Sequence, residues 1–181
     1  MLPNFLSLLR ILVIPPIIFL LYAEGDTARW AALGLYTLAC LTDYLDGVLA
    51  RGMNLSSRLG QFLDPVADKL LVATLLLMLV ATGHVAGLHT LACLIILLRE
   101  IMVSGLREFL AEIRIGMPVS RLAKWKTACQ MFALGFLIMN DVQLSFPLPA
   151  GLIGLTLLWA AALLTLVTGL DYLRAGLRYM K

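Results

Sequence analysis

The sequence predicts an all-α, polytopic membrane protein with six transmembrane helices and a polar cavity that faces the cytoplasm. Hydrophobic residues make up 61% of the 181-residue chain, and charged residues only 14%, whereas a soluble domain carries about 25%. Apolar runs recur along almost the whole length. Because lipid offers no water to backbone N–H and C=O groups, spans must be helices or closed barrels. These runs are too continuous for the alternating strands of a barrel.

Six segments are long enough to cross a bilayer, since a helical span needs about 20 mostly apolar residues. They are residues 5–23, 28–50, 60–82, 87–106, 122–140 and 148–170. The connections between them are short, so we expect residues 1–181 to form a single membrane domain. The first segment is too long for a typical signal-peptide core, and no clear cleavage site follows it, so we expect it to be a span.

Basic residues are distributed unevenly over the two sides of this predicted bundle. Of the 14 Lys and Arg residues, all but Arg29 fall on the side that holds both termini and the second and fourth connections. Because basic residues stay cytoplasmic, we expect both termini on that side of the membrane. Contact with anionic lipid accounts for part of the bias, notably for Arg174, Arg178 and Lys181.

Residues 43–68, DYLDGVLARGMNLSSRLGQFLDPVAD, hold four aspartates in this apolar chain. On ideal helices, two carboxylates share a face with two small residues at the end of the second span, and two share a face with a glycine at the start of the third. These residues are Asp43, Asp46, Gly47 and Ala50, then Gly60, Asp64 and Asp68. The polar segment between them is a helix-to-helix connection, so a hairpin would direct the two faces toward each other.

Four carboxylates at close range repel one another, and without compensation some would take up protons. Pairing with arginine is one solution: Arg51 and Arg58 are near, and Arg99 or Arg107 could approach from the fourth span. A metal site is the other, because carboxylates and substrate phosphates together hold Mg²⁺. Two such ions can clamp the attacking and leaving oxygens of a phosphoryl displacement. Small residues on the same faces leave space for a ligand and favour the metal site.

The aspartate stretch resembles the signature of the CDP-alcohol phosphatidyltransferases. It fits the pattern D-x2-D-G-x2-A-R-x8-G-x3-D-x3-D without a gap, from Asp43 to Asp68. The six transmembrane helices of that family agree with the count above. The segments LPNFLSLLRIL, FLDPVADKLL, REIMVSGLRE and KWKTACQM resemble the bacterial phosphatidylglycerophosphate synthases of the family, so the likeness covers roughly residues 2–135.

The resemblance implies transfer of the phosphatidyl group of CDP-diacylglycerol to sn-glycerol 3-phosphate, with release of CMP. It implies two divalent cations, Mg²⁺ or Mn²⁺, held by Asp43, Asp46, Asp64 and Asp68. Asp68 is also the implied general base. The residues implied to bind CDP-diacylglycerol are Asp46, Gly47, Ala50, Arg51, Ser57 and Gly60. The family further implies a homodimer among membrane lipids in the bacterial cytoplasmic membrane, with no nucleic-acid partner.

An acceptor that carries a phosphate needs cations, and a guanidinium can grip phosphate with two parallel hydrogen bonds. The candidates stand at the cytoplasmic ends of the first, fourth and fifth spans; they are Arg10, Arg99, Arg107, Lys124 and Lys126. The alternative is that these residues bind anionic head groups or pair with Glu100, Glu108 and Glu112.

Other functions remain open at this stage. All members of the family share the aspartate motif, so it does not select the acceptor, and a cardiolipin synthase, with phosphatidylglycerol as acceptor, is the main alternative. An ion channel or a divalent-cation transporter could also use aspartates inside the membrane. A transporter site, however, is expected near the bilayer midplane, whereas these aspartates lie at the cytoplasmic end of one hairpin. His84 and His89 fall in the connection on the opposite side, so we expect neither to be a ligand or base.

Overall fold

The computed structural model describes the backbone of residues 2–53, 58–113, 121–142 and 148–177, and the side chains within these ranges except those of residues 2–6, 44–53, 58–62, 64, 121 and 177. The described residues form six α-helices and no strand. The helices are α1 (Leu2–Tyr22), α2 (Asp26–Met53), α3 (Arg58–Ala81), α4 (His89–Glu112), α5 (Arg121–Ile138) and α6 (Ala150–Leu177). The all-α prediction is therefore confirmed.

The predicted segments agree with these helices to within three residues, except at two C-terminal ends. Helix α4 continues to Glu112 rather than ending at residue 106, and α6 continues to Leu177 rather than ending at residue 170. The predicted ends lie where the apolar residues stop. Backbone hydrogen bonds do not depend on apolar side chains, so a helix can continue through polar turns beyond its apolar part.

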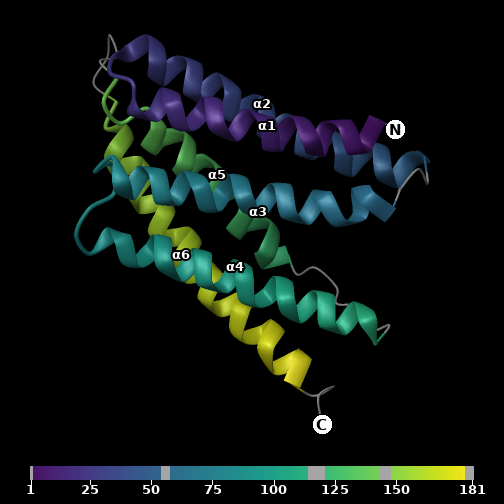
Figure 1. Ribbon diagram of the computed structural model, residues 1–181. Coiled ribbons are helices and arrows are strands. Elements are labelled where there is room, and N and C mark those ends of the chain that lie inside the picture. The colour runs from purple at the N-terminus through teal and green to yellow at the C-terminus, as the bar shows by residue number, and fades with distance from the viewer. Residues whose placement is uncertain (1, 54–57, 114–120, 143–147, 178–181) are drawn as a thin grey trace.

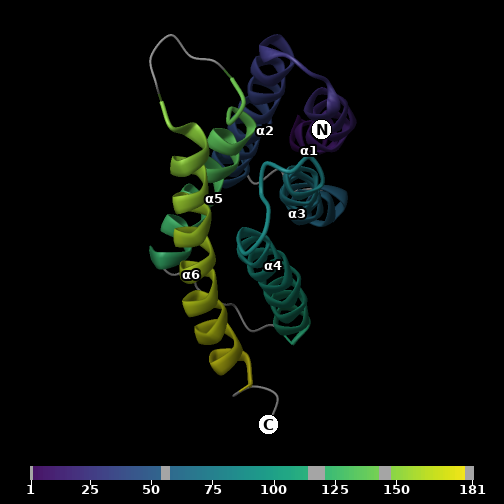
Figure 2. The same ribbon diagram turned by 90° about the vertical axis from the view of Figure 1, so that its left-hand side faces the viewer.

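The helices pack in two groups, which meet where α3 packs against α4 and α5 and where α2 packs against α5 (Figures 1 and 2). Helices α2 and α3 both pack against α1, while α5 and α4 both pack against α6. In Figure 1 the start of α1, the end of α2, the start of α3 and the end of α4 all lie toward the right-hand side. The chain thus brings its N-terminal end and both halves of the aspartate motif to one end of the bundle.

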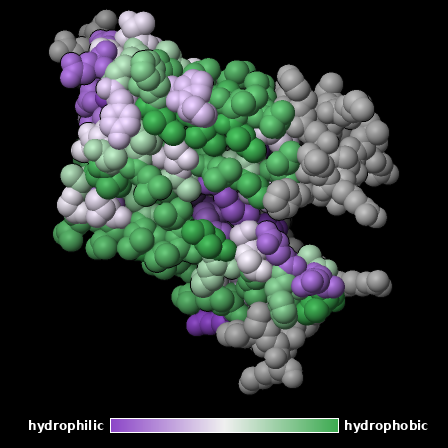
Figure 3. All heavy atoms as spheres, in the orientation of Figure 1, coloured by the Kyte–Doolittle hydropathy of each residue, from purple (hydrophilic) through white to green (hydrophobic). Residues whose placement is uncertain are grey.

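Two of the described helices, α4 and residues 150–176 of α6, are long and apolar enough to be candidate membrane spans. Only 28% and 33% of the residues in their most apolar windows are buried inside the protein, so their apolar surfaces face outward. Figure 3 shows the same property over a whole face, because hydrophobic residues cover most of it. An outward apolar surface of this extent is typical of contact with lipid.

The hydrophobic core receives residues from all six helices and lies away from the aspartate end. Its fully buried members include Ile17, Leu75, Ile96, Leu134 and Leu158. Helices α5 and α6 approach closely at Gly154, where an added Cβ would lie 2.8 Å from Leu137 Cγ. Small residues allow this kind of close packing between membrane helices.

Polar contacts join several elements at the opposite end of the bundle. Asp141, which follows α5, has its Oδ2 atom 2.6 Å from His84 Nε2 and 3.4 Å from Arg29 Nη2. Arg29 Nη1 also donates a hydrogen bond to the Leu21 carbonyl at 2.9 Å. These contacts connect the end of α1, the start of α2, the α3–α4 connection and the residues after α5. His84 therefore has structural partners, and it stands at the other end from the aspartates.

Candidate active site

Two of the four motif aspartates can be placed, and they converge from different helices. Asp43 on α2 and Asp68 on α3 each have their Oδ1 atom close to Nη1 of Arg10 on α1, at 3.0 and 3.1 Å. Arg10 has a side chain that is only 1% exposed, whereas the two carboxylates are 47% and 52% exposed. The hairpin geometry expected for these two residues is thus present, and one buried guanidinium sits between them.

The pairing of Arg10 with the motif was not anticipated from the sequence. The sequence places Arg10 among the candidates for binding an acceptor phosphate. It offers other arginines as partners of the aspartates, namely Arg51, Arg58, Arg99 and Arg107. The sequence contains part of the signal, because Arg10 is the one charged residue of α1, which is largely apolar from Leu2 to Tyr22. A buried charge of this kind requires a partner, but only the packing of α1 against α2 and α3 shows which one.

The rest of the aspartate motif lies outside the described side chains. This applies to Asp46 and Asp64 and to the predicted nucleotide-binding residues Gly47, Ala50, Arg51, Ser57 and Gly60. Within the described part of the chain, no group of three or more His, Cys, Asp or Glu residues is arranged to hold a metal ion. A cage of four carboxylates therefore stays a prediction.

The two described carboxylates are nevertheless suited to a hard cation. Each approaches Arg10 through Oδ1, and each side chain is about half exposed, so carboxylate oxygen on both helices remains accessible. Divalent cations such as Mg²⁺ take oxygen ligands, usually from one or two carboxylates together with substrate phosphates. Asp43 and Asp68 fit such an ion in two ways, because both offer carboxylate oxygens and both approach the same point from different helices.

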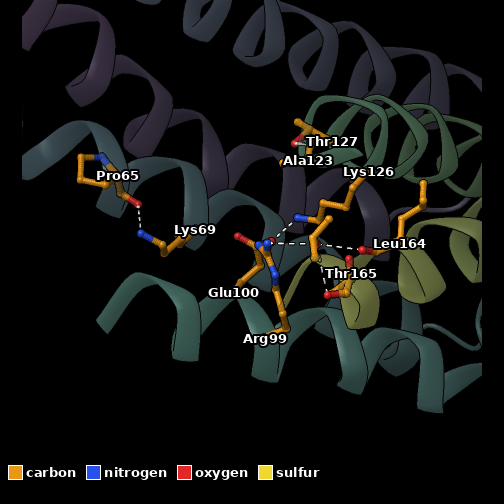
Figure 4. Close-up of polar contacts among 10 residues, drawn as sticks. Pro65, Lys69, Arg99, Glu100, Ala123, Lys126, Thr127, Leu164 and Thr165 are labelled. Atoms are coloured by element: carbon orange, nitrogen blue, oxygen red, sulfur yellow. Dashed lines mark hydrogen bonds and ion pairs between the residues drawn. The ribbon is translucent and has the colours of Figure 1, made fainter. Parts of the chain in front are cut away.

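A second charged cluster joins α4 and α5 beside this site (Figure 4). Glu100 on α4 accepts hydrogen bonds at Oε1 from Lys126 Nζ on α5 and, at 3.1 Å, from Arg99 Nη1. The side chains of Arg99, Glu100 and Lys126 are 10%, 21% and 6% exposed. Buried charges are costly unless they are paired and hydrogen-bonded, so one carboxylate compensates two cations.

Arg99 is also packed against α6. Its Nη2 atom donates to Thr168 Oγ1 at 3.2 Å, and its guanidinium carbon lies 5.6 Å from the centre of the Tyr172 ring. At Gly169 an added Cβ would lie 2.9 Å from Arg99 Cγ, so the glycine makes space for the arginine. Arg99 therefore connects α4 to α6 as well as to Glu100.

A polar cavity of about 270 Å³ opens between α3 and α4. From α3 it is lined by Pro65 and Lys69, and from α4 by Arg99, Glu100, Val103, Ser104, Arg107, Glu108 and Ala111. Lys69 Nζ donates to the Pro65 carbonyl at 3.2 Å. Figure 3 shows hydrophilic residues gathered in the hollow between these two helices. Basic and acidic groups thus line the cavity together. One of them, Lys69, directly follows Asp68 on α3.

The structure divides the five candidates for acceptor binding into three settings. Arg10 is with the aspartates, and Arg99 and Lys126 are paired with Glu100, which is the pairing considered as an alternative. Arg107 lines the cavity, is exposed, and has no ion pair among the described residues. Lys124 is exposed on α5 and is not part of this cavity. Of the five, Arg107 is the one whose guanidinium is both in the cavity and available to an anion.

The chain is similar over nearly its whole length to known proteins of one family. Residues 1–167 match the profile of the CDP-alcohol phosphatidyltransferase family. The chain is 46% identical to the CDP-diacylglycerol–glycerol-3-phosphate 3-phosphatidyltransferase of Rickettsia typhi over 98% of both chains. It is 42% identical to the protein of the same name from Pseudomonas fluorescens over 99% of this chain and 91% of the relative. A Cereibacter sphaeroides relative with this name is 36% identical over 99% and 96% of the two chains.

The Glu100 cluster leads to a prediction about stability. We expect Glu100→Gln to lower the free energy of unfolding by about 3–5 kcal/mol, because it leaves the Lys126 and Arg99 cations buried without an anion. Unfolding in mixed micelles, titrated with a denaturing detergent, measures the change. Glu108→Gln is the matched control, since Glu108 lines the same cavity but is exposed, and we expect a change within about 0.5 kcal/mol. Equal losses in both variants would contradict the role of Glu100.

Proposed function

Because the chain belongs to the CDP-alcohol phosphatidyltransferase family, we propose that it acts as a CDP-diacylglycerol–glycerol-3-phosphate 3-phosphatidyltransferase. It transfers the phosphatidyl group of CDP-diacylglycerol to sn-glycerol 3-phosphate, and it releases CMP. The observation that carries this conclusion is the likeness, over nearly the whole chain, to bacterial proteins of that name. The convergence of Asp43 and Asp68 supplies the beginning of a site for the reaction.

Enzymes of this family are generally dependent on divalent metal ions. We propose that Asp43, Asp46, Asp64 and Asp68 hold two such ions, Mg²⁺ or Mn²⁺. When bound, the ions would neutralise the pyrophosphate of the donor and stabilise the leaving CMP. The proposed contacts of the CDP group are Asp46, Gly47, Ala50, Arg51, Ser57 and Gly60.

Asp68 is the proposed general base. As the 1-hydroxyl oxygen of glycerol 3-phosphate forms its bond to the β-phosphorus of the donor, that hydroxyl loses its proton to the Asp68 carboxylate, and the bond from phosphorus to the CMP oxygen breaks. A carboxylate within hydrogen-bond reach can accept such a proton. Arg10 contacts Asp68 through Oδ1, so Oδ2 is the oxygen that we assign to the proton. Arg10 holds the side chain in place and keeps it close to Asp43.

The acceptor phosphate is proposed to bind in the cavity between α3 and α4. Arg107 can form two parallel hydrogen bonds with it, and it lines the same cavity as Lys69, the residue that follows Asp68 on α3. Arg99 and Lys126 add positive charge next to Glu100. Lys124 and Arg10 stay candidates for acceptor binding, although neither lines this cavity. Positioning of the hydroxyl next to the base, and not covalent chemistry by the protein, would then supply much of the rate.

The membrane arrangement is part of the proposal. All six helices are proposed to cross the bacterial cytoplasmic membrane, with both termini and the aspartate end on the cytoplasmic side. The basic residues at that end support this orientation, and the two candidate spans support crossing of the membrane. CDP-diacylglycerol carries its fatty chains in lipid and its nucleotide in water, so the reacting phosphorus lies at the membrane surface. A homodimer among membrane lipids is proposed from the family alone.

An activity assay of the purified protein, with CDP-diacylglycerol and a panel of acceptors, tests the proposed function. We expect CMP release and phosphatidylglycerophosphate formation with sn-glycerol 3-phosphate, loss of both on chelation, and recovery with Mg²⁺ or Mn²⁺. Inositol phosphate, serine and choline should give no product. Formation of cardiolipin from phosphatidylglycerol, without reaction of glycerol 3-phosphate, would replace the proposed acceptor. Metal flux into liposomes without CMP release would instead indicate a transporter.

Substitution of the proposed base gives a second expectation. Asp68→Asn should abolish turnover, while binding of CDP-diacylglycerol largely survives, because the amide cannot accept the proton. Turnover is measured as CMP release, and binding by equilibrium titration with the labelled donor. Asp171→Asn, at an exposed carboxylate on α6, serves as control and should keep normal turnover. A near-normal rate in Asp68→Asn would remove this residue from the role.

The proposed acceptor site leads to a prediction about substrate binding. Arg107→Ala should raise the KM for glycerol 3-phosphate roughly tenfold or more and change the KM for the lipid donor less, since a hydrogen bond to a charged group contributes about 1.5–3 kcal/mol. Steady-state kinetics with each substrate varied in turn separates the two constants. Arg174→Ala, at an exposed arginine on α6, is the control for a general loss of positive charge. An unchanged acceptor KM would place the phosphate elsewhere.

A further inference from the structure

An apolar groove of about 410 Å³ lies between α2 and α5, apart from the polar cavity. Leu33, Tyr36, Thr37 and Cys40 line it from α2, and Ala128, Met131, Phe132, Gly135 and Phe136 line it from α5. Its floor is closed where the Tyr36 hydroxyl donates to the Met131 carbonyl at 3.1 Å. Thr37, Met131 and Phe132 stand exposed at its edges. The groove is therefore open to the surroundings of the bundle along its length.

The polar end of the groove can be located from the register of the two helices. Tyr36 meets Met131, and an added Cβ at Gly135 would lie 3.7 Å from Leu33 Cδ1. Residue numbers thus rise along α2 as they fall along α5, so the helices are antiparallel. Continuing the same register brings the level of Asp43 on α2 to that of Lys124 on α5.

Both of these charged residues continue the faces that line the groove. Asp43 is three residues beyond Cys40 and seven beyond Tyr36, and these spacings keep it on one side of α2. Lys124 is four residues before Ala128, on the corresponding side of α5. The groove therefore has an apolar body and an end where a carboxylate of the proposed catalytic set and a lysine stand. Such a surface matches an amphipathic molecule with a charged head.

The length of this surface matches one leaflet of a bilayer. Leu33 and Asp43 are ten residues apart on α2, which corresponds to about 15 Å along the helix axis. The hydrocarbon core of a bilayer is about 30 Å thick, so one leaflet contributes about 15 Å. A fatty chain that starts at the level of Asp43 would reach the far end of the groove at the depth where its leaflet ends.

We propose that the groove between α2 and α5 binds one acyl chain of the CDP-diacylglycerol donor and so sets the position of its pyrophosphate at Asp43. This inference rests on the proposed function, since it assigns a place to the lipid part of that substrate. An acyl chain bound there keeps the donor aligned with the carboxylates while its second chain stays in the bilayer. Recognition then depends on the length of the chain, because each methylene in the groove adds apolar contact.

Gly135 offers a way to fill the groove without touching the charged site. An added Cβ at this position would meet Leu33 Cδ1 at 3.7 Å and Tyr36 Cε1 at 3.9 Å, which are ordinary contacts, so Gly135→Ala should be accommodated. Gly135→Leu projects further into the groove and occupies the space proposed for the chain. Gly34→Leu is the matched control, because Gly34 lies on α2 outside the groove and an added Cβ there has nothing within 4 Å.

The experiment compares a dioleoyl donor with a dihexanoyl donor in the same detergent micelles. We expect Gly135→Leu to raise the KM for the dioleoyl donor by about tenfold or more, because methylenes are excluded from the groove, with little change in kcat. The KM for the dihexanoyl donor should change far less, since its chains barely enter the groove. Gly135→Ala and Gly34→Leu should leave both constants near those of the unmodified protein.

Three results would overturn the assignment. One is an unchanged KM for the dioleoyl donor in Gly135→Leu, and another is an equal rise for both donors in a variant whose thermal unfolding is normal. The third is a change of oligomeric state in sedimentation without a change in donor preference, which would make the groove an interface between two copies. If the unmodified protein releases no CMP from either donor, the proposed function fails, and that result is distinct from these three.

Discussion

Compensation of charge between helices is the constraint on which this structure depends. The bundle is largely apolar, and charged groups inside it are costly unless an opposite charge meets them. Arg10 from α1 meets carboxylates from α2 and α3, and Glu100 from α4 meets Lys126 from α5. In each case the partners come from different helices. The pairs therefore specify how the helices stand relative to one another, in addition to keeping the charges tolerable.

The two clusters belong to the two groups of helices seen in the fold. The Arg10 cluster joins α1, α2 and α3, and the cluster around Glu100 joins α4, α5 and, through Arg99 and Thr168, α6. The polar cavity lies where the groups meet, with α3 on one side and α4 on the other. One group thus presents the carboxylates of Asp43 and Asp68, and the other presents Arg107, the proposed acceptor contact, at the cavity wall.

The substrate class accounts for the combination of a polar cavity and an apolar groove in one small chain. A lipid nucleotide has a head that requires carboxylates and water, and tails that require hydrocarbon. The aspartate end supplies the first environment, and the outward apolar surfaces of the helices supply the second. Helix α2 contributes to both, with Asp43 at one level and Tyr36 and Cys40 at another. The face of a single helix can thus align the two parts of one molecule.

The sequence alone determined the helical class, the six segments and the resemblance to a family, because these depend on local properties: runs of apolar residues, their length, and the spacing of the aspartates. The gap-free motif also indicated that carboxylates from two helices meet, and Asp43 and Asp68 do so.

Only the tertiary structure decided which cations serve the carboxylates and which serve the cavity. The periodicity of one helix shows the face on which a residue lies, but not the helix that will cover that face. Arg10 is 33 residues from Asp43 and 58 from Asp68 in the chain, and Lys126 is 26 residues from Glu100. Their pairing follows from how the six helices pack. This packing depends on the apolar contacts of the whole bundle, so no single segment predicts it.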